Sequence, residues 1–190
     1  MVEQNNIPLY KRIIFIGYMG AGKTTLGKAL SNEIKLPFYD LDFYIENRRH
    51  KSIDNLFKEF GETGFRKIEH FMLHEVAEFE NIILSSGGGT PCFFDNIDYM
   101  NKQGITIFLK ATPEVLFTHI KMSKKIRPLL LNKTEEDIKD FIKSELKKRE
   151  QFYQKAKYTV NIETLDNKQK IQDTVRQLKN IIYNKIEENK

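Results

Sequence analysis

A nine-residue stretch, GYMGAGKTT at residues 17–25, constrains this chain more than any other feature of its sequence. It follows a short apolar run at residues 13–16. The pattern G-x-x-x-x-G-K-[ST], in which a strand turns sharply into a helix around a nucleotide's phosphates, is matched by Gly17, Gly22, Lys23 and Thr24. A glycine-rich turn without a ligand is disfavoured, because a strand pattern precedes the stretch and an amphipathic pattern follows it. We therefore predict that the chain binds a nucleoside triphosphate.

Each part of this loop has a physical role. Glycine lacks a side chain, so the loop glycines can take positive φ and turn successive backbone N–H groups toward an anion. The helix that begins near Lys23 adds the positive end of its dipole. Lys23 is predicted to reach the β- and γ-phosphates, and the Thr24 hydroxyl is predicted to bind Mg²⁺. The predicted nucleotide-binding residues of the loop are Gly20, Ala21, Gly22, Lys23, Thr24 and Thr25.

The bulk properties favour one soluble domain spanning residues 1–190. A chain of this length can bury a sizeable core, and no apolar run approaches the roughly 18 residues that a membrane span needs. The N-terminus lacks a signal-peptide pattern, and the single cysteine, Cys92, cannot form an intrachain disulfide. The net charge of +5 is spread over helices that alternate Lys with Glu, without a nucleic-acid-binding motif. We expect a cytoplasmic monomer with no nucleic-acid or membrane partner.

Hydrophobic periodicity predicts strands that alternate with helices. The predicted strands cover residues 13–16, 38–42, 82–84, 105–109 and 158–162. The predicted helices cover residues 23–34, 43–49, about 52–60, 65–80, 134–157 and 168–186. Two further helices are predicted, one that ends near residue 102 and one that begins at residue 112. Such alternation favours a mostly parallel sheet with helices on both faces.

Two of these helices show a clear apolar stripe. The stripe of the helix at 65–80 comprises Ile68, Phe71, Met72, Val76 and Phe79. The helix at 134–157 is predicted to begin with Thr134 as its cap and Asp137 in its first turn. Its predicted buried side comprises Ile138, Phe141, Ile142, Leu146 and Phe152.

Three further stretches carry chemistry. Asp40 and Asp42 end a predicted strand and, by its period of two, are expected on one face. The run Gly87–Gly89 follows the next strand, where ligands of parallel sheets bind, so its N–H groups are predicted to meet an anionic substrate rather than to form only a flexible turn. Residues 122–133 are basic around Arg127 and lack periodicity, which favours a mobile lid.

Several other readings are disfavoured. A GTPase needs an Asn-Lys-x-Asp-like element and a motor ATPase an apolar strand ending in Asp-Glu, and neither pattern stands in place. His70 and His74 have the i, i+4 spacing that can hold a metal, but no third ligand is evident, so a pair on a helix surface is favoured. Cys92, after the glycine run, is interpreted as a packed thiol rather than a reactive one.

With these motifs in this order, the chain closely resembles the shikimate kinase family over roughly residues 10–165. The order also includes Arg66 to Glu69, Arg127 to Leu130 and the pair Lys148-Arg149. The resemblance implies a three-layer α/β/α P-loop NTPase fold, similar to nucleoside monophosphate kinases, with a central five-stranded parallel sheet. It also implies a substrate-binding helical region at about 43–80 and a mobile lid at about 122–133.

The family pattern assigns roles residue by residue. Lys23 is implied to contact the transferred phosphate, and Arg127 to add positive charge from the lid. Thr24 is implied to bind Mg²⁺ directly, and Asp40 to support the ion through water. Asp42 is implied to orient, or to deprotonate, the attacking hydroxyl. The residues implied to bind the shikimate carboxylate or to line its pocket are Arg66, Arg149, Gly87, Gly88, Gly89, Phe57, Phe65 and Glu69. Where many members carry an arginine near adenine, this chain reads His119 to Met122, and Lys121 is the candidate substitute.

The function that this resemblance implies is ATP-dependent phosphorylation of the shikimate 3-hydroxyl, which gives shikimate 3-phosphate and ADP. ATP and Mg²⁺ are the implied cofactors. Two alternatives stay open at this point. One is a related P-loop kinase for another small polyol acid such as gluconate, and the other is a nucleotide-binding regulator without turnover.

Overall fold

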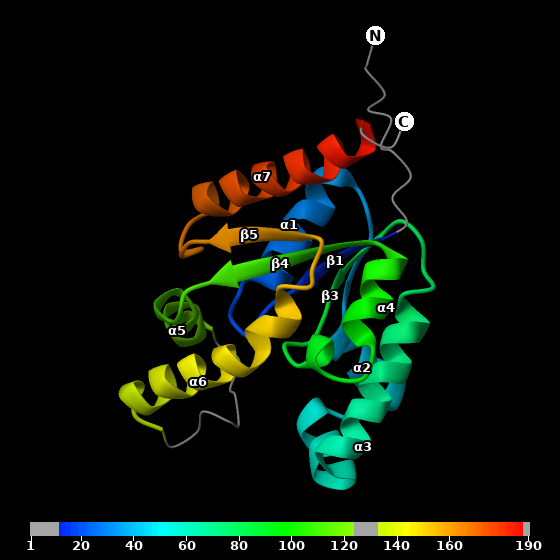
Figure 1. Cartoon of the computed structure of the whole chain (residues 1–190), viewed down its shortest axis with the longest axis vertical. Coiled ribbons are helices and arrows are strands. Elements are labelled where there is room, and N and C mark those ends of the chain that lie inside the picture. The colour runs from blue at the N-terminus through cyan, green and yellow to red at the C-terminus, as the bar shows by residue number, and fades with distance from the viewer. Residues whose placement is uncertain (1–11, 124–132, 188–190) are drawn as a thin grey trace.

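Five short strands form the centre of the molecule, a parallel sheet with the strand order β2-β3-β1-β4-β5 (Figure 1). The computed structural model describes residues 12–123 and 133–187, with side chains as far as residue 183. The strands are β1 (Arg12–Ile16), β2 (Phe38–Asp40), β3 (Ile82–Ser85), β4 (Ile105–Ala111) and β5 (Tyr158–Ile162). The predicted five-stranded parallel sheet is therefore confirmed.

The central strand β1 is buried along its whole length. It pairs with β3 on one side and with β4 on the other, so that Ile14 lies opposite Leu84 and Thr106. A strand that is covered on both faces reads as a continuous apolar run rather than an alternating one. The run of residues 13–16 is apolar for this reason.

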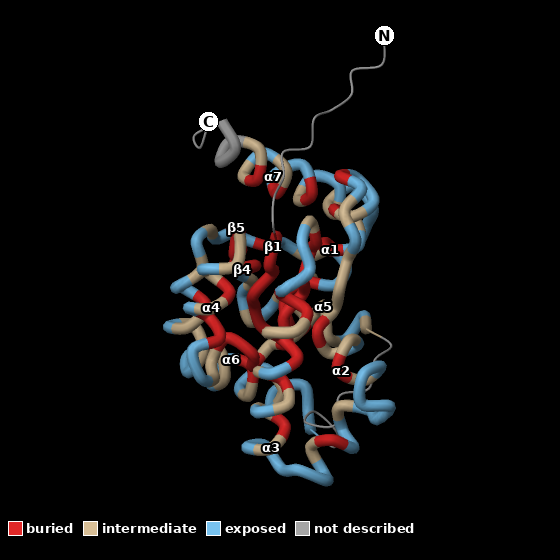
Figure 2. The backbone as a smooth tube through the Cα atoms, turned by 90° about the vertical axis from the view of Figure 1, so that its right-hand side faces the viewer, coloured by how far each residue is buried: buried red, intermediate tan, exposed pale blue. Residues whose placement is uncertain are grey.

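Helices cover both faces of the sheet, and Figure 2 shows the buried residues gathered between the layers. The helices are α1 (Lys23–Ile34), α2 (Leu41–Arg49), α3 (Ile53–Val76), α4 (Asn96–Gln103), α5 (Pro113–Met122), α6 (Glu135–Tyr153) and α7 (Lys168–Glu187), with a short 3₁₀ helix, η1 (Thr90–Cys92). In Figure 2, α1 lies on one side of the strands and α4 on the other, and α7 packs against α1. The predicted three-layer arrangement is confirmed.

The second strand is shorter than predicted, and the expectation that Asp40 and Asp42 share a strand face is wrong. β2 ends at Asp40, whose side chain accepts a hydrogen bond from the Phe43 backbone N–H and so caps α2. Asp42 lies in the first turn of α2, where a carboxylate also suits the positive end of the helix dipole. The capping bond favours a helix here over two further strand residues.

The long helix α3 also differs from its prediction. It runs across Gly61, where φ of 64° and ψ of −178° bend the chain in a conformation that is essentially restricted to glycine. It ends at Val76 rather than near Glu80. Phe71, predicted on the apolar stripe, is 61% exposed and lies off the buried face. The kink at Gly61 lies between the two helices predicted at about 52–60 and 65–80, which the structure joins into one bent helix.

Helix α6 begins as predicted, because Thr134 and Asp137 form a reciprocal capping box. It ends at Tyr153, four residues before the predicted end at Lys157, and Tyr153 is one of its buried residues together with Ile142. Most of the predicted lid, including Arg127, falls in residues 124–132, which lie outside the described residues. Among the helices described, none is both long enough and apolar enough to cross a membrane.

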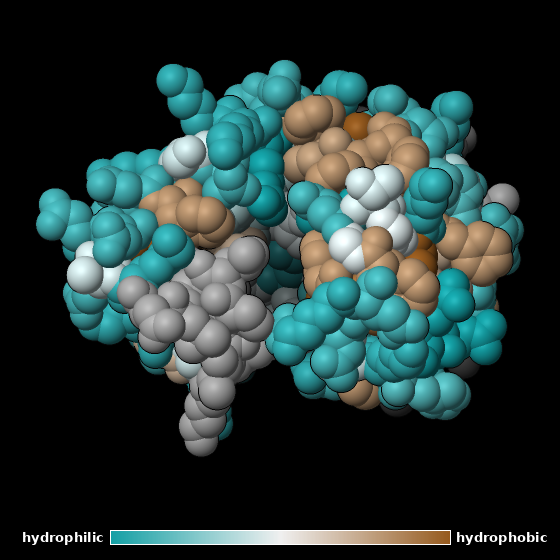
Figure 3. All heavy atoms as spheres, turned by 90° about the horizontal axis from the view of Figure 1, so that it is seen from below, coloured by the Kyte–Doolittle hydropathy of each residue, from teal (hydrophilic) through white to brown (hydrophobic). Residues whose placement is uncertain are grey.

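Seen from below, the surface is hollowed between the side that carries α6 and the side that carries α3, and hydrophobic side chains border the hollow (Figure 3). Large apolar side chains that remain exposed include Phe43, Phe60, Phe71 and Phe94. The carboxyl ends of the parallel strands, where ligands of such sheets bind, carry the residues described next.

Candidate active site

The phosphate loop leaves the sheet at the point where the strand order reverses, since β1 lies between β3 and β4. Open parallel sheets bind their ligands at this position. Three loop glycines take positive φ: 148° at Gly17, 83° at Gly20 and 87° at Gly22. Gly22 is the N-cap of α1, so the loop leads directly into the positive end of that helix. The backbone therefore has the form of a phosphate-binding nest.

Lys23 is the first residue of α1, and only 9% of its surface is exposed. Its ammonium donates hydrogen bonds to the carbonyl oxygens of Gly17, at 2.7 Å, and Tyr18, at 3.0 Å. The loop's own carbonyls therefore hold the positive charge beside the N–H groups that would meet a phosphate. A buried cation in this position attracts polyanions strongly because little water screens it.

Thr24 and Asp40 offer oxygen atoms side by side. The Thr24 hydroxyl donates to the Asp40 carboxylate at 2.7 Å, and the other carboxylate oxygen accepts from the Phe43 N–H at 3.4 Å. Mg²⁺ prefers hard oxygen ligands and usually combines one or two protein oxygens with water and phosphate oxygens. This pair of residues therefore fits a Mg²⁺ ion next to the phosphate loop.

A cavity of about 430 Å³ opens beside the phosphate loop. The residues that line it are Gly20, Gly22, Lys23, Thr24, Thr25, His119, Met122, Ser123 and Leu165. Lys121 is not among them, because its ammonium pairs with Glu135 at 2.5 Å on the surface. Ala21 is buried behind the loop. A larger cavity, between β4, β5, α5 and α6, contains none of the phosphate-loop residues.

His119 is a functional candidate that the sequence analysis did not assign. Its Nδ1–H donates to the Gly20 carbonyl at 2.7 Å, and its Nε2 accepts from the Leu165 backbone N–H at 2.7 Å. One imidazole thus joins the phosphate loop to the segment after β5, and all three residues line the same cavity. A lone histidine on an amphipathic helix gives no sequence signal for such a bridge, because its two partners are 99 and 46 residues away.

The glycine run Gly87–Gly89 lets three charged side chains approach the backbone closely. A Cβ atom added at Gly87 would lie 2.8 Å from Glu69 Oε1 and 3.0 Å from Asp42 Oδ1, and one at Gly89 would lie 2.6 Å from an Arg66 guanidinium nitrogen. A larger residue has no room at either position. The run therefore brings together Asp42, Arg66 and Glu69 from two different helices.

Arg66 lies in an aromatic cage with one buried carboxylate. Its guanidinium is 4.2 Å from the ring centroid of Phe93 and 5.4 and 5.6 Å from those of Phe65 and Phe57. It pairs with Glu69 at 2.8 Å. The Arg66 Nε–H is buried and has no hydrogen-bond partner among the described residues. A buried donor without a partner is costly, which suggests that it is reserved for a ligand.

Glu69 is itself 1% exposed, and it accepts a 2.6 Å hydrogen bond from the Thr90 hydroxyl. Both of its oxygens are thus used, one for Thr90 and one for Arg66, so Glu69 positions the arginine. Phe57 and Phe65 stack with a centroid distance of 4.1 Å and form the wall of the cage.

Arg149 approaches the glycine run from α6. It pairs with Glu145 one turn earlier, and its guanidinium lies 5.4 Å from the ring centroid of Tyr18 in the phosphate loop. On the same helix, the Tyr153 hydroxyl donates to the Gly88 carbonyl at 2.6 Å. A Cβ atom at Gly88 would lie 3.3 Å from the Met19 backbone nitrogen. Helix α6, the glycine run and the phosphate loop are therefore adjacent.

Comparison with known proteins agrees with this geometry. A family model described as shikimate kinase matches residues 19–179. The chain belongs to the shikimate kinase family. It is 55% identical over 168 residues to the shikimate kinase of Phocaeicola vulgatus, covering 88% of this chain and 96% of that relative.

Two solved structures of shikimate kinases are also similar to the whole of this fold. That of Bacteroides thetaiotaomicron is 48% identical, with a TM-score of 0.89 and coverage of 91% of this chain and 98% of that one. The structure from Acinetobacter baumannii, in complex with shikimate, is 30% identical, with a TM-score of 0.81 and coverage of 93% of this chain and 94% of that one. A gluconokinase from Sinorhizobium meliloti, at 13% identity and a TM-score of 0.53, shares the fold alone.

As a member of this family, the chain is a kinase of aromatic amino-acid biosynthesis. It transfers a phosphoryl group from ATP to the 3-hydroxyl of shikimate and releases shikimate 3-phosphate and ADP. The alternative acceptor, gluconate, and the alternative of a regulator without turnover have no comparable support.

Proposed function

We propose that this chain binds shikimate through Arg66 and Arg149, which hold the carboxylate, and through Asp42, which holds the attacking hydroxyl. The observation that carries the proposal is the approach of Asp42, Glu69 and Arg66 to Gly87–Gly89, next to the phosphate loop. Two guanidinium groups suit one carboxylate because each can form a forked pair of charged hydrogen bonds. The shikimate complex of the Acinetobacter baumannii relative supports an acceptor site in this fold.

The phosphate side of the proposal gives Lys23 the transferred phosphoryl group. Phosphoryl transfer asks little covalent chemistry of a protein, so positioning and charge neutralisation supply most of the catalysis. Lys23 neutralises charge on the β- and γ-phosphates, and the loop N–H groups hold them in line with the hydroxyl at Asp42. Orientation by Asp42 is sufficient for a loose transition state, and proton acceptance is a further role that its carboxylate can fill.

We also propose that Thr24 and Asp40 hold Mg²⁺, since the 2.7 Å hydroxyl–carboxylate pair supplies the hard oxygens that this ion prefers. When bound, the ion adds positive charge at the β- and γ-phosphates. Gly20, Gly22, Thr24 and Thr25 line the cavity proposed for ATP. Arg127, outside the described residues, and Lys121, at the edge of the site, stay predictions.

A monomer is sufficient for this proposal because one chain supplies every residue named. Its solution state can be measured by light scattering. A cytoplasmic location is proposed from the single cysteine and from the biosynthetic reaction.

The assignment is tested by coupled ADP release with shikimate, with gluconate and with neither, for the wild type, Asp42→Asn and a matched surface control, Asp54→Asn. We expect turnover with shikimate only. Asp42→Asn keeps the shape of the side chain but removes its charge, so kcat should fall by at least about 100-fold. Asp54→Asn should match the wild type. Equal turnover with gluconate would contradict the acceptor assignment, and an unchanged kcat for Asp42→Asn would contradict the role of Asp42.

A further inference from the structure

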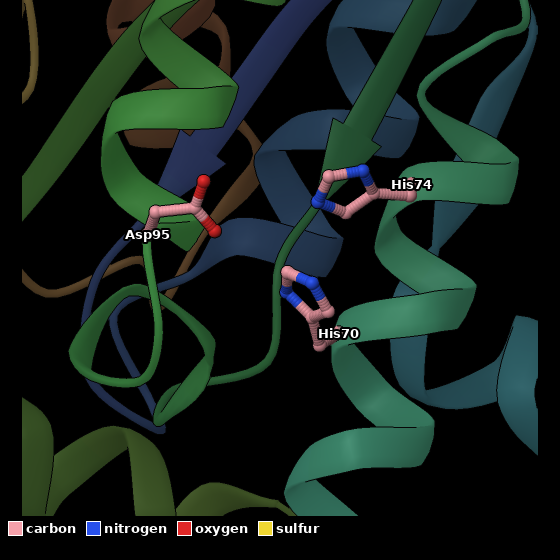
Figure 4. A group of neighbouring side chains, drawn as sticks. All are labelled: His70, His74 and Asp95. Atoms are coloured by element: carbon pink, nitrogen blue, oxygen red, sulfur yellow. The ribbon is translucent and has the colours of Figure 1, made fainter.

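Outside the active site, two histidines and one carboxylate converge between α3 and the start of α4 (Figure 4). His70 and His74 stand one turn apart on α3, with ring centroids 4.4 Å apart. Asp95 is the N-cap residue of α4, yet its side chain makes no capping hydrogen bond. One ligand atom from each of the three residues lies within 4.8 Å of the other two. The phosphoryl-transfer reaction gives these groups no role.

The hydrogen bonds around His70 decide which ring nitrogen carries its proton. The His70 Nδ1 is 2.6 Å from the side-chain oxygen of Asn96. Asn96 is fully buried, and its amide nitrogen donates to the Thr90 carbonyl at 2.8 Å, so its oxygen must be the acceptor. The His70 Nδ1 therefore carries the hydrogen, and a neutral ring keeps its lone pair on Nε2. Metal-binding histidines are held in the same way, with the second ring nitrogen donating to an oxygen.

His74 presents the complementary feature. Its Nε2 is buried and has no hydrogen-bond partner among the described residues. The ring is held by stacking on Tyr99, with a centroid distance of 3.6 Å and an interplanar angle of 16°. In Figure 4, a ring nitrogen of His74 faces the Asp95 carboxylate. A buried polar atom without a partner is rare in folded proteins and calls for a ligand or a water.

We propose that His70, His74 and Asp95 bind a divalent transition-metal ion, for which Zn²⁺ is the best fit. Two imidazoles and one carboxylate form a donor set that suits Zn²⁺, Co²⁺ or Ni²⁺, and the imidazoles disfavour Mg²⁺. Bonds of about 2.0–2.2 Å to a tetrahedral ion place ligand atoms about 3.3 Å apart. The three atoms lie within 4.8 Å of one another, so each pair needs to close by at most about 1.5 Å. Asp95 is exposed, so its carboxylate can rotate inward, and water can take the fourth position.

The ion would be structural and would connect α3 to the segment before α4. Asn96 contacts both His70 and the Thr90 carbonyl, and the Thr90 hydroxyl donates to Glu69, which holds Arg66. Metal binding at the three ligands would therefore stiffen the wall from which Arg66 extends. This site is separate from the Thr24–Asp40 pair that fits Mg²⁺.

The experiment uses the full chain, stripped with a chelator and kept in excess Mg²⁺ so that oxygen-only sites are filled. Zn²⁺ and Co²⁺ are titrated by calorimetry, Co²⁺ also by its visible absorption, and Tm is measured in parallel. We expect saturable binding of one ion and, at about 100 times Kd, a rise in Tm of about 5–10 °C. His74→Gln and Asp95→Asn should each weaken binding by at least about 10-fold, as the loss of even an indirect metal contact does.

Two comparisons make the result decisive. Asp95 is exposed and its side chain makes no capping hydrogen bond, so the metal-free Tm of Asp95→Asn should equal that of the wild type. This separates lost binding from misfolding. His50→Asn removes a histidine at an exposed αL position outside the cluster and should bind as the wild type does. Absence of saturable binding would overturn the proposal. So would binding that neither His74→Gln nor Asp95→Asn weakens, because the ion would then lie elsewhere.

Discussion

The guanidinium of Arg66, which we propose binds the shikimate carboxylate, is held in place by its neighbours. Three aromatic rings and the buried Glu69 hold it in place, while its Nε–H has no partner among the described residues. Arg149 pairs with Glu145 and reaches the same region from another helix. A charge held in a fixed orientation loses little entropy on binding its ligand, so each arginine should contribute its full charged hydrogen bond.

We expect Arg66→Ala and Arg149→Ala each to weaken shikimate binding by about 10- to 150-fold, because a charged hydrogen bond contributes about 1.5–3 kcal/mol. ATP affinity should barely change. Calorimetry on the two variants, with Arg176→Ala as a control on the exposed side of α7, measures this. A shikimate analogue without its carboxylate should bind the wild type weakly. The arginine variants should bind this analogue with little further loss of affinity, because the interaction that they remove is already absent. Equal binding of analogue and shikimate by the wild type would refute the carboxylate assignment.

The second prediction at this scale concerns Cys92, whose half-buried thiol has its pKa raised to about 11 by burial. Near neutral pH the thiolate fraction is about 100-fold below that of a thiol with the ordinary pKa of 9.0, and the greater nucleophilicity at high pKa recovers part of this. Alkylation should therefore be about 10-fold slower than for the protein unfolded in urea. Its rate should rise as the pH approaches 11. Equal rates in the two states would contradict a packed thiol.

Between elements, His119 is the contact that joins α5 to the phosphate loop and to the segment after β5. Both of its ring nitrogens are used, one by the Gly20 carbonyl and one by the Leu165 N–H, at 2.7 Å each. Gly22 adds to the closeness of this packing, since a Cβ atom there would lie 2.5 Å from a Leu165 methyl carbon. The geometry of the nucleotide cavity thus depends on a contact between three separate elements.

We expect His119→Ala to raise KM for ATP by about 10-fold, because it removes two partly buried hydrogen bonds of about 0.5–1.5 kcal/mol each from the cavity proposed for ATP. KM for shikimate should change much less, since the acceptor residues lie on α2, α3 and α6. Steady-state kinetics with each substrate varied in turn measures both constants. His50→Asn, a histidine far from the loop in sequence, is the control. A parallel rise in both KM values would contradict a role confined to the nucleotide side of the site.

For the whole molecule, α7 matters through packing alone. Its buried side chains Val175, Leu178 and Ile182 face the core, and it packs against α1, which carries the phosphate loop at its start. Among the described residues, none from α7 lines the cavity beside the phosphate loop. Stability and catalysis should therefore respond separately to changes in this helix.

We expect Leu178→Ala to lower the free energy of unfolding by about 2–5 kcal/mol, because it leaves a cavity in a fully buried position. Thermal or urea unfolding measures this. The kcat of Leu178→Ala at 25 °C should stay within about twofold of the wild-type value. The neighbouring Lys179→Ala removes a surface pair with Glu33 and should cost at most about 1 kcal/mol. A large loss of kcat with little loss of stability would show that α7 acts on the site.

Local patterns were enough to predict the phosphate loop, the five-stranded parallel sheet and the capping box at Thr134. In each case the physical cause lies within a few residues: glycine's freedom at positive φ, apolar runs at strand length and a reciprocal pair of capping hydrogen bonds. The motif order also pointed to the family, and through it to the kinase activity. Residues 122–133 stay a prediction as a lid.

Only the tertiary structure decided the features that depend on distant partners. Asp42 belongs to a helix because Asp40 caps that helix, and α3 bends because Gly61 takes positive φ. His119 bridges Gly20, which lies 99 positions before it in the chain, and Leu165, which lies 46 positions after it. Asp95 lies 21 residues beyond His74 in the chain and comes close to the two histidines because η1 packs against α3. Sequence periodicity reports which face of an element is buried, but which side chains meet across elements is set by long-range packing, which no local pattern records.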